Sequence, residues 1–266
     1  MNDKLTAYLR RVRYAGTPRP DLATLTALHR AHLFNIPYEN LEIHRGGRMT
    51  LDAGEIYRKL VEERRGGWCY EMNGLFAWAL REIGFDVTLL ASTVGRLVRS
   101  PVLEHSHLVL LVQLDQPYLA DVGFGNGLIE PIPLVEGAYR QWFFDYRLWR
   151  DGDRWWFENQ PHGGPGYDFN LEAWQLGDFG EVAHYQQTSP ESGFVRVAVC
   201  QRLTPDGLFT LRDVTLKQFT PDGISERIIT DADDYAATLA NVFDLHVPDD
   251  TLWAKAQARH AERAQP

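Results

Sequence analysis

The feature that most constrains the fold of this chain is a change of hydrophobic period near residue 85. Before that point, apolar residues recur every three or four positions, as on the buried face of an amphipathic helix. After it, short segments rich in leucine and β-branched residues lie between turn residues, which is typical of strands. The helical period covers 3–12, 20–34, 50–63 and 68–83, and it returns at 233–245. Helices followed mainly by strands predict an α+β protein.

Turn signals divide the strand-rich part of the chain. Asp151-Gly152-Asp153 lies between two aromatic segments and predicts a hairpin. Two Pro-Asp-Gly turns, at 205–207 and 221–223, separate alternating segments in the C-terminal part. We expect three domains, 1–90, 91–190 and 191–266. The pattern places the boundaries between them to within several residues.

The charge and the cysteine content argue against several classes of protein. The chain has 27 Lys and Arg against 36 Asp and Glu, a net charge of 27 − 36 = −9, which argues against a nucleic-acid partner. The apolar run Leu108–Leu111 is far shorter than the roughly 18 residues of a membrane span, and the N-terminus lacks the apolar core of a signal peptide. Two cysteines cannot form a disulfide framework, so a reducing, cytoplasmic setting is expected. The oligomeric state stays open, a homo-oligomer included.

Cys69 is placed where a thiol can become reactive. It lies in the first turn of the helix expected at 68–83, directly after Gly66-Gly67. Unpaired N–H groups and the helix dipole favour a thiolate there, and such positions lower the pKa of reactive cysteines. The alternative is a small buried core residue, which most free cysteines are. Cys200 lies within a strand pattern and is predicted to be such a core residue.

A catalytic thiolate needs a base and a group that orients the base. His107 opens an apolar strand, but His105 has the same parity, so periodicity does not choose between them. Asp121 lies in the apolar segment that follows, where a carboxylate is costly to bury unless it accepts hydrogen bonds. A buried aspartate can be satisfied by orienting a histidine. The commoner case is an aspartate that ends a strand or starts a turn.

The length of the loop between these two strands decides whether His107 and Asp121 can meet. A two-residue turn at Asp115-Gln116 places Asp121 opposite Leu110, on the other face of the sheet from His107. A three-residue loop, 114–116, places Asp121 opposite Val109, as a diagonal neighbour on the face of His107. The catalytic hypothesis therefore requires an odd loop or a bulge.

Other functions are compatible with the same residues. Zinc could bind Cys69, His105, His107 and Asp121, but their spacing matches no compact zinc pattern and no cysteine pair is present. The glycine-rich segment 123–127 has the wrong spacing for a Rossmann or Walker phosphate motif, although its N–H groups could accept a carbonyl or a phosphate. A non-catalytic binding module with a buried cysteine is a further alternative.

Four sequence blocks resemble those of the arylamine N-acetyltransferases. "RGGWCYEMN" resembles the family signature, "IPYENLEIH" a second stretch, and "SHLVLLV" and "ADVGFG" the segments that carry its histidine and aspartate. The blocks occur in the family's order over 36–125, and "SGFVRVAVCQR" fits more loosely. The resemblance implies an N-terminal helical bundle carrying the nucleophile, a central antiparallel β-barrel carrying histidine and aspartate, and a C-terminal α/β lid. The catalytic core would be like that of cysteine proteases and transglutaminases.

The resemblance also implies the chemistry. An acetyl group would pass from acetyl-CoA to an arylamine or arylhydrazine in ping-pong order. Cys69 would be the nucleophile, His107 its base and Asp121 the orienting acid, which selects His107 over His105. Acetyl-CoA would be a co-substrate, with no permanently bound cofactor and no metal. Two other Cys-His-Asp functions remain open: amide synthesis in polyketide biosynthesis, and thiol hydrolysis of the transglutaminase type.

The resemblance assigns further residues around the site. Tyr38, Phe124 and Gly125 match pocket and CoA-side positions, and Ser106 and Phe194 match CoA contacts more weakly. Tyr38 departs from the phenylalanine that many members carry and adds a hydroxyl to the pocket wall. The remaining expectations concern charge: a structural pair of Glu39 and Arg65, and CoA phosphates held by local arginines such as Arg96 or Arg99.

Overall fold

The N-terminal third of the computed structural model is helical, and the structure describes residues 2–247 and 251–264. The side chain of Asp21 accepts a hydrogen bond from the Thr24 N–H and so caps the helix that the period at 20–34 predicts. The helix predicted at 50–63 is instead α4 followed by a π turn, η1. The elements are α1 (Asp3–Arg11), α2 (Leu22–Asn35), α3 (Leu41–His44), α4 (Ala53–Tyr57), η1 (Arg58–Glu62) and α5 (Cys69–Ile83).

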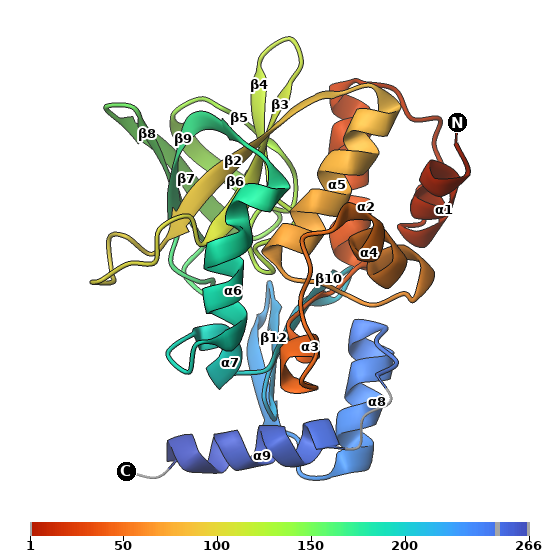
Figure 1. The fold of residues 1–266 in the computed structure, drawn as a ribbon, viewed down its shortest axis with the longest axis vertical. Coiled ribbons are helices and arrows are strands. Elements are labelled where there is room, and N and C mark those ends of the chain that lie inside the picture. The colour runs from red at the N-terminus through yellow and green to blue at the C-terminus, as the bar shows by residue number, and fades with distance from the viewer. Residues whose placement is uncertain (1, 248–250, 265–266) are drawn as a thin grey trace.

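Helix α5 lies at the centre of the molecule, between α2 and the barrel (Figure 1). It begins at Cys69 and ends at Ile83, close to the predicted range 68–83, and Gly84 caps its C-terminus. Nearly all residues of its first and middle turns are buried, so the neighbours of Cys69 on the helix are packed inside the protein. The predicted apolar face is buried through Met72, Leu75, Phe76, Ala79 and Leu80.

The central part forms a nearly closed antiparallel barrel, as predicted. In the described residues its eight strands follow the order β5-β4-β3-β2-β9-β8-β7-β6. The Tyr139 hydroxyl on one edge strand donates to the Val135 carbonyl at 2.6 Å, and it lies 3.3 Å from the carbonyl of Pro133 on the other edge strand. The strands are β2 (Asp86–Val94), β3 (His107–Gln113), β4 (Pro117–Ala120), β5 (Ile132–Pro133), β6 (Gly137–Gln141), β7 (Phe144–Asp151), β8 (Arg154–Glu158) and β9 (Tyr167–Trp174).

The predicted turns in the strand-rich part are confirmed. Asp151 pairs with Arg154, so Gly152-Asp153 is a two-residue hairpin turn between β7 and β8. Both Pro-Asp-Gly segments connect paired strands of the C-terminal sheet. These strands are β10 (Val199–Thr204), β11 (Gly207–Arg212), β12 (Thr215–Thr220) and β13 (Gly223–Ile228).

The C-terminal part is an α/β lid whose sheet includes a strand from the N-terminal third. Strand β1 (Tyr38–Glu39) pairs with β10, and Tyr38 lies opposite Gln201. Figure 1 shows this sheet below the barrel, with two helices at the lower end of the molecule. The helical elements η2 (Leu176–Phe179) and α6 (Gly180–Thr188) lead from the barrel to this part, which contains α7 (Gly193–Arg196), α8 (Ala232–Phe243) and α9 (Thr251–Ala264). No helix in the described part of the chain is long and apolar enough to cross a membrane.

Candidate active site

The loop between β3 and β4 has the odd length that the catalytic hypothesis requires. Gln113 pairs with Pro117, which leaves three residues, 114–116, in the loop. Leu110 pairs with Ala120, so the same register extended by one pair puts Asp121 opposite Val109. His107 and Asp121 then share a face, and His107 Nε2 lies 2.8 Å from Asp121 Oδ2. The predicted meeting of the two side chains is confirmed.

The structure also separates His107 from His105. Strand β3 begins at His107, which is 2% exposed. His105 lies before the strand with a φ of 55°, and its exposed ring packs 4.5 Å from the Trp174 ring. Parity therefore does not apply to His105. Within residues 2–247 and 251–264, no group of three or more His, Cys, Asp or Glu side chains could hold a metal ion.

Asp121 is buried, and its oxygens are satisfied. His107 contacts Oδ2, while Oδ1 accepts hydrogen bonds from Asn73 Nδ2 and the Gly123 N–H, each at 2.8 Å. Burial would raise the pKa of Asp121, but His107 and these hydrogen bonds hold it below its ordinary value. The Asp121 N–H donates to Nε2 of His29 at 3.1 Å. Asp121 is therefore an ionised carboxylate fixed on both its side chain and its backbone.

Asn73 ties the cysteine helix to the histidine strand. It lies one turn after Cys69 on α5, and its Nδ2 donates to the Leu108 carbonyl at 2.6 Å as well as to Asp121. Its Oδ1 accepts the Val122 N–H at 2.9 Å. Sequence reasoning missed Asn73, although a polar residue four positions after Cys69 on an otherwise apolar face was a usable signal.

Gly123 lets the segment after β4 approach the start of α5 closely. A Cβ atom at this position would lie 2.8 Å from Cys69 Cα and 2.5 Å from Asn73 Nδ2. Both distances are too short for non-bonded atoms, so a side chain at residue 123 would push the aspartate segment away from the thiol. The glycine is therefore required by the packing of the site.

Cys69 is the first residue of α5 and lines a cavity together with His107. Burial raises the pKa of its thiol, and the negative charge of Asp121 adds to this; the N–H groups of Tyr70 and Leu108 act in the opposite direction. The lowered pKa expected from the helix terminus is therefore wrong for the free site, because desolvation outweighs the helix N–H groups. A thiolate here needs a cationic partner, and Nδ1 of His107 is the ring nitrogen that Asp121 leaves open.

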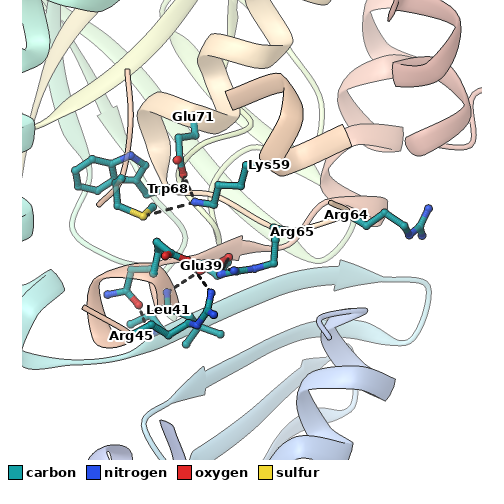
Figure 2. A network of polar contacts seen from close by, with 12 residues as sticks. Glu39, Leu41, Arg45, Lys59, Arg64, Arg65, Trp68 and Glu71 are labelled. Carbon is teal, nitrogen blue, oxygen red and sulfur yellow. Dashed lines mark hydrogen bonds and ion pairs between the residues drawn. The ribbon is translucent and has the colours of Figure 1, made fainter. Parts of the chain in front are cut away.

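Two buried ion pairs support the backbone that leads into Cys69 (Figure 2). Arg65 contacts Glu39 at 2.8 Å, which confirms the predicted charge pair, and it also contacts Glu42 at 3.2 Å. Lys59 contacts Glu71 at 2.7 Å. Glu71 in turn accepts the Trp68 N–H at 3.3 Å, directly before Cys69.

The Lys59–Glu71 pair was not predicted from the sequence. The π turn η1 displaces the side chains by part of a turn from an α-helical pattern, and Lys59 is buried on it. Burial raises the pKa of Glu71, and Lys59 opposes that shift. The pair therefore buries one positive and one negative charge side by side at the first turn of α5.

The cavity has a volume of about 710 Å³ and contains most of the predicted pocket residues. The Phe124 ring lies 5.0 Å from the His107 ring and forms an apolar wall beside it. Gly125 is not among the residues that line the cavity. Its φ is 75°, and a Cβ atom there would clash with the Gln201 side chain and contact the Tyr38 ring. The predicted residues that line the cavity are Tyr38, Cys69, Ser106, His107, Phe124 and Phe194.

Comparison with known proteins gives one consistent family. Residues 21–252 match a family model described as N-acetyltransferase. The arylamine N-acetyltransferase of Escherichia coli (strain K12) is 34% identical over 259 residues, covering 94% of this chain and 91% of that protein.

Solved structures agree with the sequence comparison. The arylamine N-acetyltransferase from Salmonella typhimurium is 30% identical with a TM-score of 0.90, covering 97% of this chain and 99% of that one. The Mycobacterium marinum arylamine N-acetyltransferase in complex with CoA is 31% identical with a TM-score of 0.87, covering 96% and 97%.

Proposed function

Because this chain belongs to the arylamine N-acetyltransferase family, an acyltransferase family, we propose that it moves the acetyl group of acetyl-CoA to an arylamine or arylhydrazine through an acetyl-Cys69 intermediate. The observation that carries the proposal is the buried His107–Asp121 contact of 2.8 Å beside the cavity that Cys69 lines. A thiol, an imidazole and a carboxylate in this order form the arrangement that acyl transfer through a cysteine requires.

The first half-reaction loads the acetyl group on the enzyme. Nδ1 of His107 takes the thiol proton, and the resulting imidazolium compensates the thiolate that burial disfavours. Sulfur attacks the thioester carbonyl, and the N–H groups at the start of α5 stabilise the oxyanion. The bond between the carbonyl carbon and the CoA sulfur then breaks, and the CoA thiolate takes the proton from His107. Acetyl-Cys69 and free CoA remain.

The second half-reaction releases the product. The amine nitrogen attacks the acetyl-Cys69 carbonyl, the bond to the Cys69 sulfur breaks, and His107 accepts the surplus amine proton. Asp121 holds the proton on Nε2 of His107, which keeps Nδ1 available as the base. The products are the N-acetylated amine and the Cys69–His107 pair ready for another donor.

The pocket walls favour a flat, apolar acceptor. Phe124 and Phe194 line the cavity together with Tyr38, and aromatic walls suit an aromatic ring. The Tyr38 hydroxyl adds a polar group to this wall. We also propose that residues 1–90 supply the nucleophile, 91–190 the histidine and aspartate, and 191–266 the lid over the cavity.

Steady-state kinetics test the function. Initial rates measured while acetyl-CoA and aniline are varied should give parallel double-reciprocal lines, because CoA leaves before the amine reacts. Intersecting lines would argue for direct transfer without an acetyl-enzyme. Hydrolysis of peptide amides without acetyl transfer would replace the proposal with a thiol hydrolase.

A further inference from the structure

The cavity wall has the opposite charge to the chain as a whole. The chain carries a net charge of −9, yet its cavity is lined by three cationic side chains and one carboxylate. The cations are Arg99, Arg212 and Lys217, and the carboxylate is Glu191. An anion is therefore attracted to the cavity against the average charge of the molecule.

Two of the cations lie on the lid sheet at the end of a row that starts beside the thiol. Tyr38 bridges to Gly67, two residues before Cys69. From Tyr38 the row runs across neighbouring strands to Gln201, Thr210 and Lys217, and all four residues line the cavity. Three strand spacings put Lys217 about 14 Å from Tyr38.

Arg212 belongs to the same face as this row. It lies two residues after Thr210 on β11, so it is on the same side of the sheet and diagonal to Lys217. Both side chains therefore reach the cavity from its lid side. Arg99 reaches it from the loop after β2, on the barrel side.

These cations are available to a ligand. Arg99 and Arg212 are exposed, and within the described part of the chain their side chains make no ion pair or hydrogen bond. Among the same residues, the ion pair of Lys217 is with Glu226, at 2.7 Å, and this pair is exposed enough to exchange partners at little cost. Arg96, by contrast, is engaged by Glu104 and Asp168, so it is the weaker of the two arginines expected to bind phosphate.

We propose that Arg99, Arg212 and Lys217 form the phosphate-binding wall of the cavity and hold the phosphate groups of the acyl donor. The inference rests on the proposed function, in which the donor is acetyl-CoA. CoA carries its phosphates at the far end of a long pantetheine arm, and the row from Tyr38 to Lys217 spans such a separation. Guanidinium groups bind phosphate oxygens in pairs, and an ammonium adds a point charge.

The test compares two donors that differ in their phosphates. Cys69 acetylation is followed by intact mass with acetyl-CoA and with S-acetylpantetheine, which has none. Neutralising two cations in Arg212→Gln/Lys217→Gln should raise the apparent KM for acetyl-CoA about tenfold or more, with little change in the maximal rate. The rate with S-acetylpantetheine should stay within twofold of the parent's rate. Added salt should raise the apparent KM for acetyl-CoA less in the variant than in the parent.

An arginine outside the cavity lining provides the matched control. Arg10→Gln removes an exposed arginine from α1 and should leave both donors unaffected. An unchanged KM for acetyl-CoA in the double variant would overturn the phosphate-binding wall while the proposed function stands. An equal loss with both donors would also overturn it, since the cations would then act on the reaction or the fold. Failure of both donors to acetylate the parent enzyme would instead overturn the proposed function.

Discussion

The two cysteines of this chain lie in regions that are equally buried. The regions differ in secondary structure, in access from a cavity and in the presence of a histidine. Cys69 and Cys200 are 2% and 1% exposed, and burial raises the pKa of both thiols. Cys69 begins a helix and lines the cavity with His107. Cys200 lies within β10 and packs with Leu211 and Leu41 in an apolar core that is separate from the one around α5.

The difference shows that neither burial nor the pKa of an isolated thiol identifies a nucleophile. What separates Cys69 is access from a cavity and an imidazole held by an ionised carboxylate. Glu39 raises the pKa of Cys200 and Arg65 lowers it, but Cys200 does not line the cavity.

The largest effect is expected from exchanging the thiols themselves. Cys69→Ser should lower the rate of arylamine acetylation about 10³-fold or more, because a hydroxyl is a far weaker nucleophile at neutral pH. Cys200→Ala should keep the rate per folded molecule and cost about 1–2 kcal/mol of stability through the cavity it leaves. Initial rates and urea unfolding measure both effects. Equal rate losses in the two variants would remove the contrast.

Two buried aspartates extend the comparison. Asp121→Asn should lower kcat about 10³- to 10⁴-fold, because an amide does not hold the His107 tautomer as a carboxylate does. Asp213, which is equally buried but paired with Arg259 at 2.8 Å in the lid, serves as the control. Asp213→Asn should lower the free energy of unfolding and leave kcat per folded molecule nearly unchanged. A kcat loss of similar size at Asp213 would contradict the assignment.

The ion pair beneath α5 should contribute through stability. Lys59→Met leaves Glu71 buried without its cation, and removing one partner of such a pair costs about 3–5 kcal/mol. The double variant Lys59→Met/Glu71→Gln should recover part of this loss, because no unpaired charge remains. Urea unfolding of the single and double variants measures the coupling. A single variant that loses less than about 1 kcal/mol would show that the pair is not needed here.

The smallest effect concerns acid sensitivity on the Cys69 side. Burial lowers the pKa of His29 from 6.5 to about 4, and its Nε2 accepts the Asp121 N–H. Between these two pH values the unfolded chain binds a proton that the folded chain does not. As the pH drops through this window, His29 alone should lower the free energy of unfolding by about 3 kcal/mol. Burial also lowers the pKa of His44 to about 4 and that of His32, so these two histidines add to the fall.

A variant without the titrating group checks the cause of this acid sensitivity. His29→Gln should make the pH dependence of urea unfolding between pH 6.5 and 4 shallower by the contribution of one histidine, because His32 and His44 still titrate. His184→Gln, which changes an exposed histidine, should not. An unaltered slope in His29→Gln would assign the acid sensitivity to other groups.

Features set by local pattern could be predicted from the sequence. The period of α5, the Asp21 cap and the turn at Gly152-Asp153 depend on residues close together in the chain. The odd loop at 114–116 could be stated as a requirement, because strand parity is a local property. The burial of Cys200 followed from its strand pattern in the same way.

Features set by distant contacts could not be predicted in this way. Asn73 is recognised only when β3 and the segment after β4 are placed against α5. The Lys59–Glu71 pair depends on a π turn, which has no period of its own in the sequence. The direction in which the pKa of Cys69 shifts depends on how deeply the helix terminus is buried. An argument from the helix alone does not include this burial.

The central claim is that Cys69, and not the equally buried Cys200, carries the acetyl group between donor and acceptor. The most direct test is intact mass and peptide mapping after addition of acetyl-CoA to the parent chain, Cys69→Ala and Cys200→Ala. We predict one acetyl group on Cys69 in the parent and in Cys200→Ala, lost when an arylamine is added, and none in Cys69→Ala. An acetyl group that persists in Cys69→Ala, or that maps to Cys200, would contradict the account.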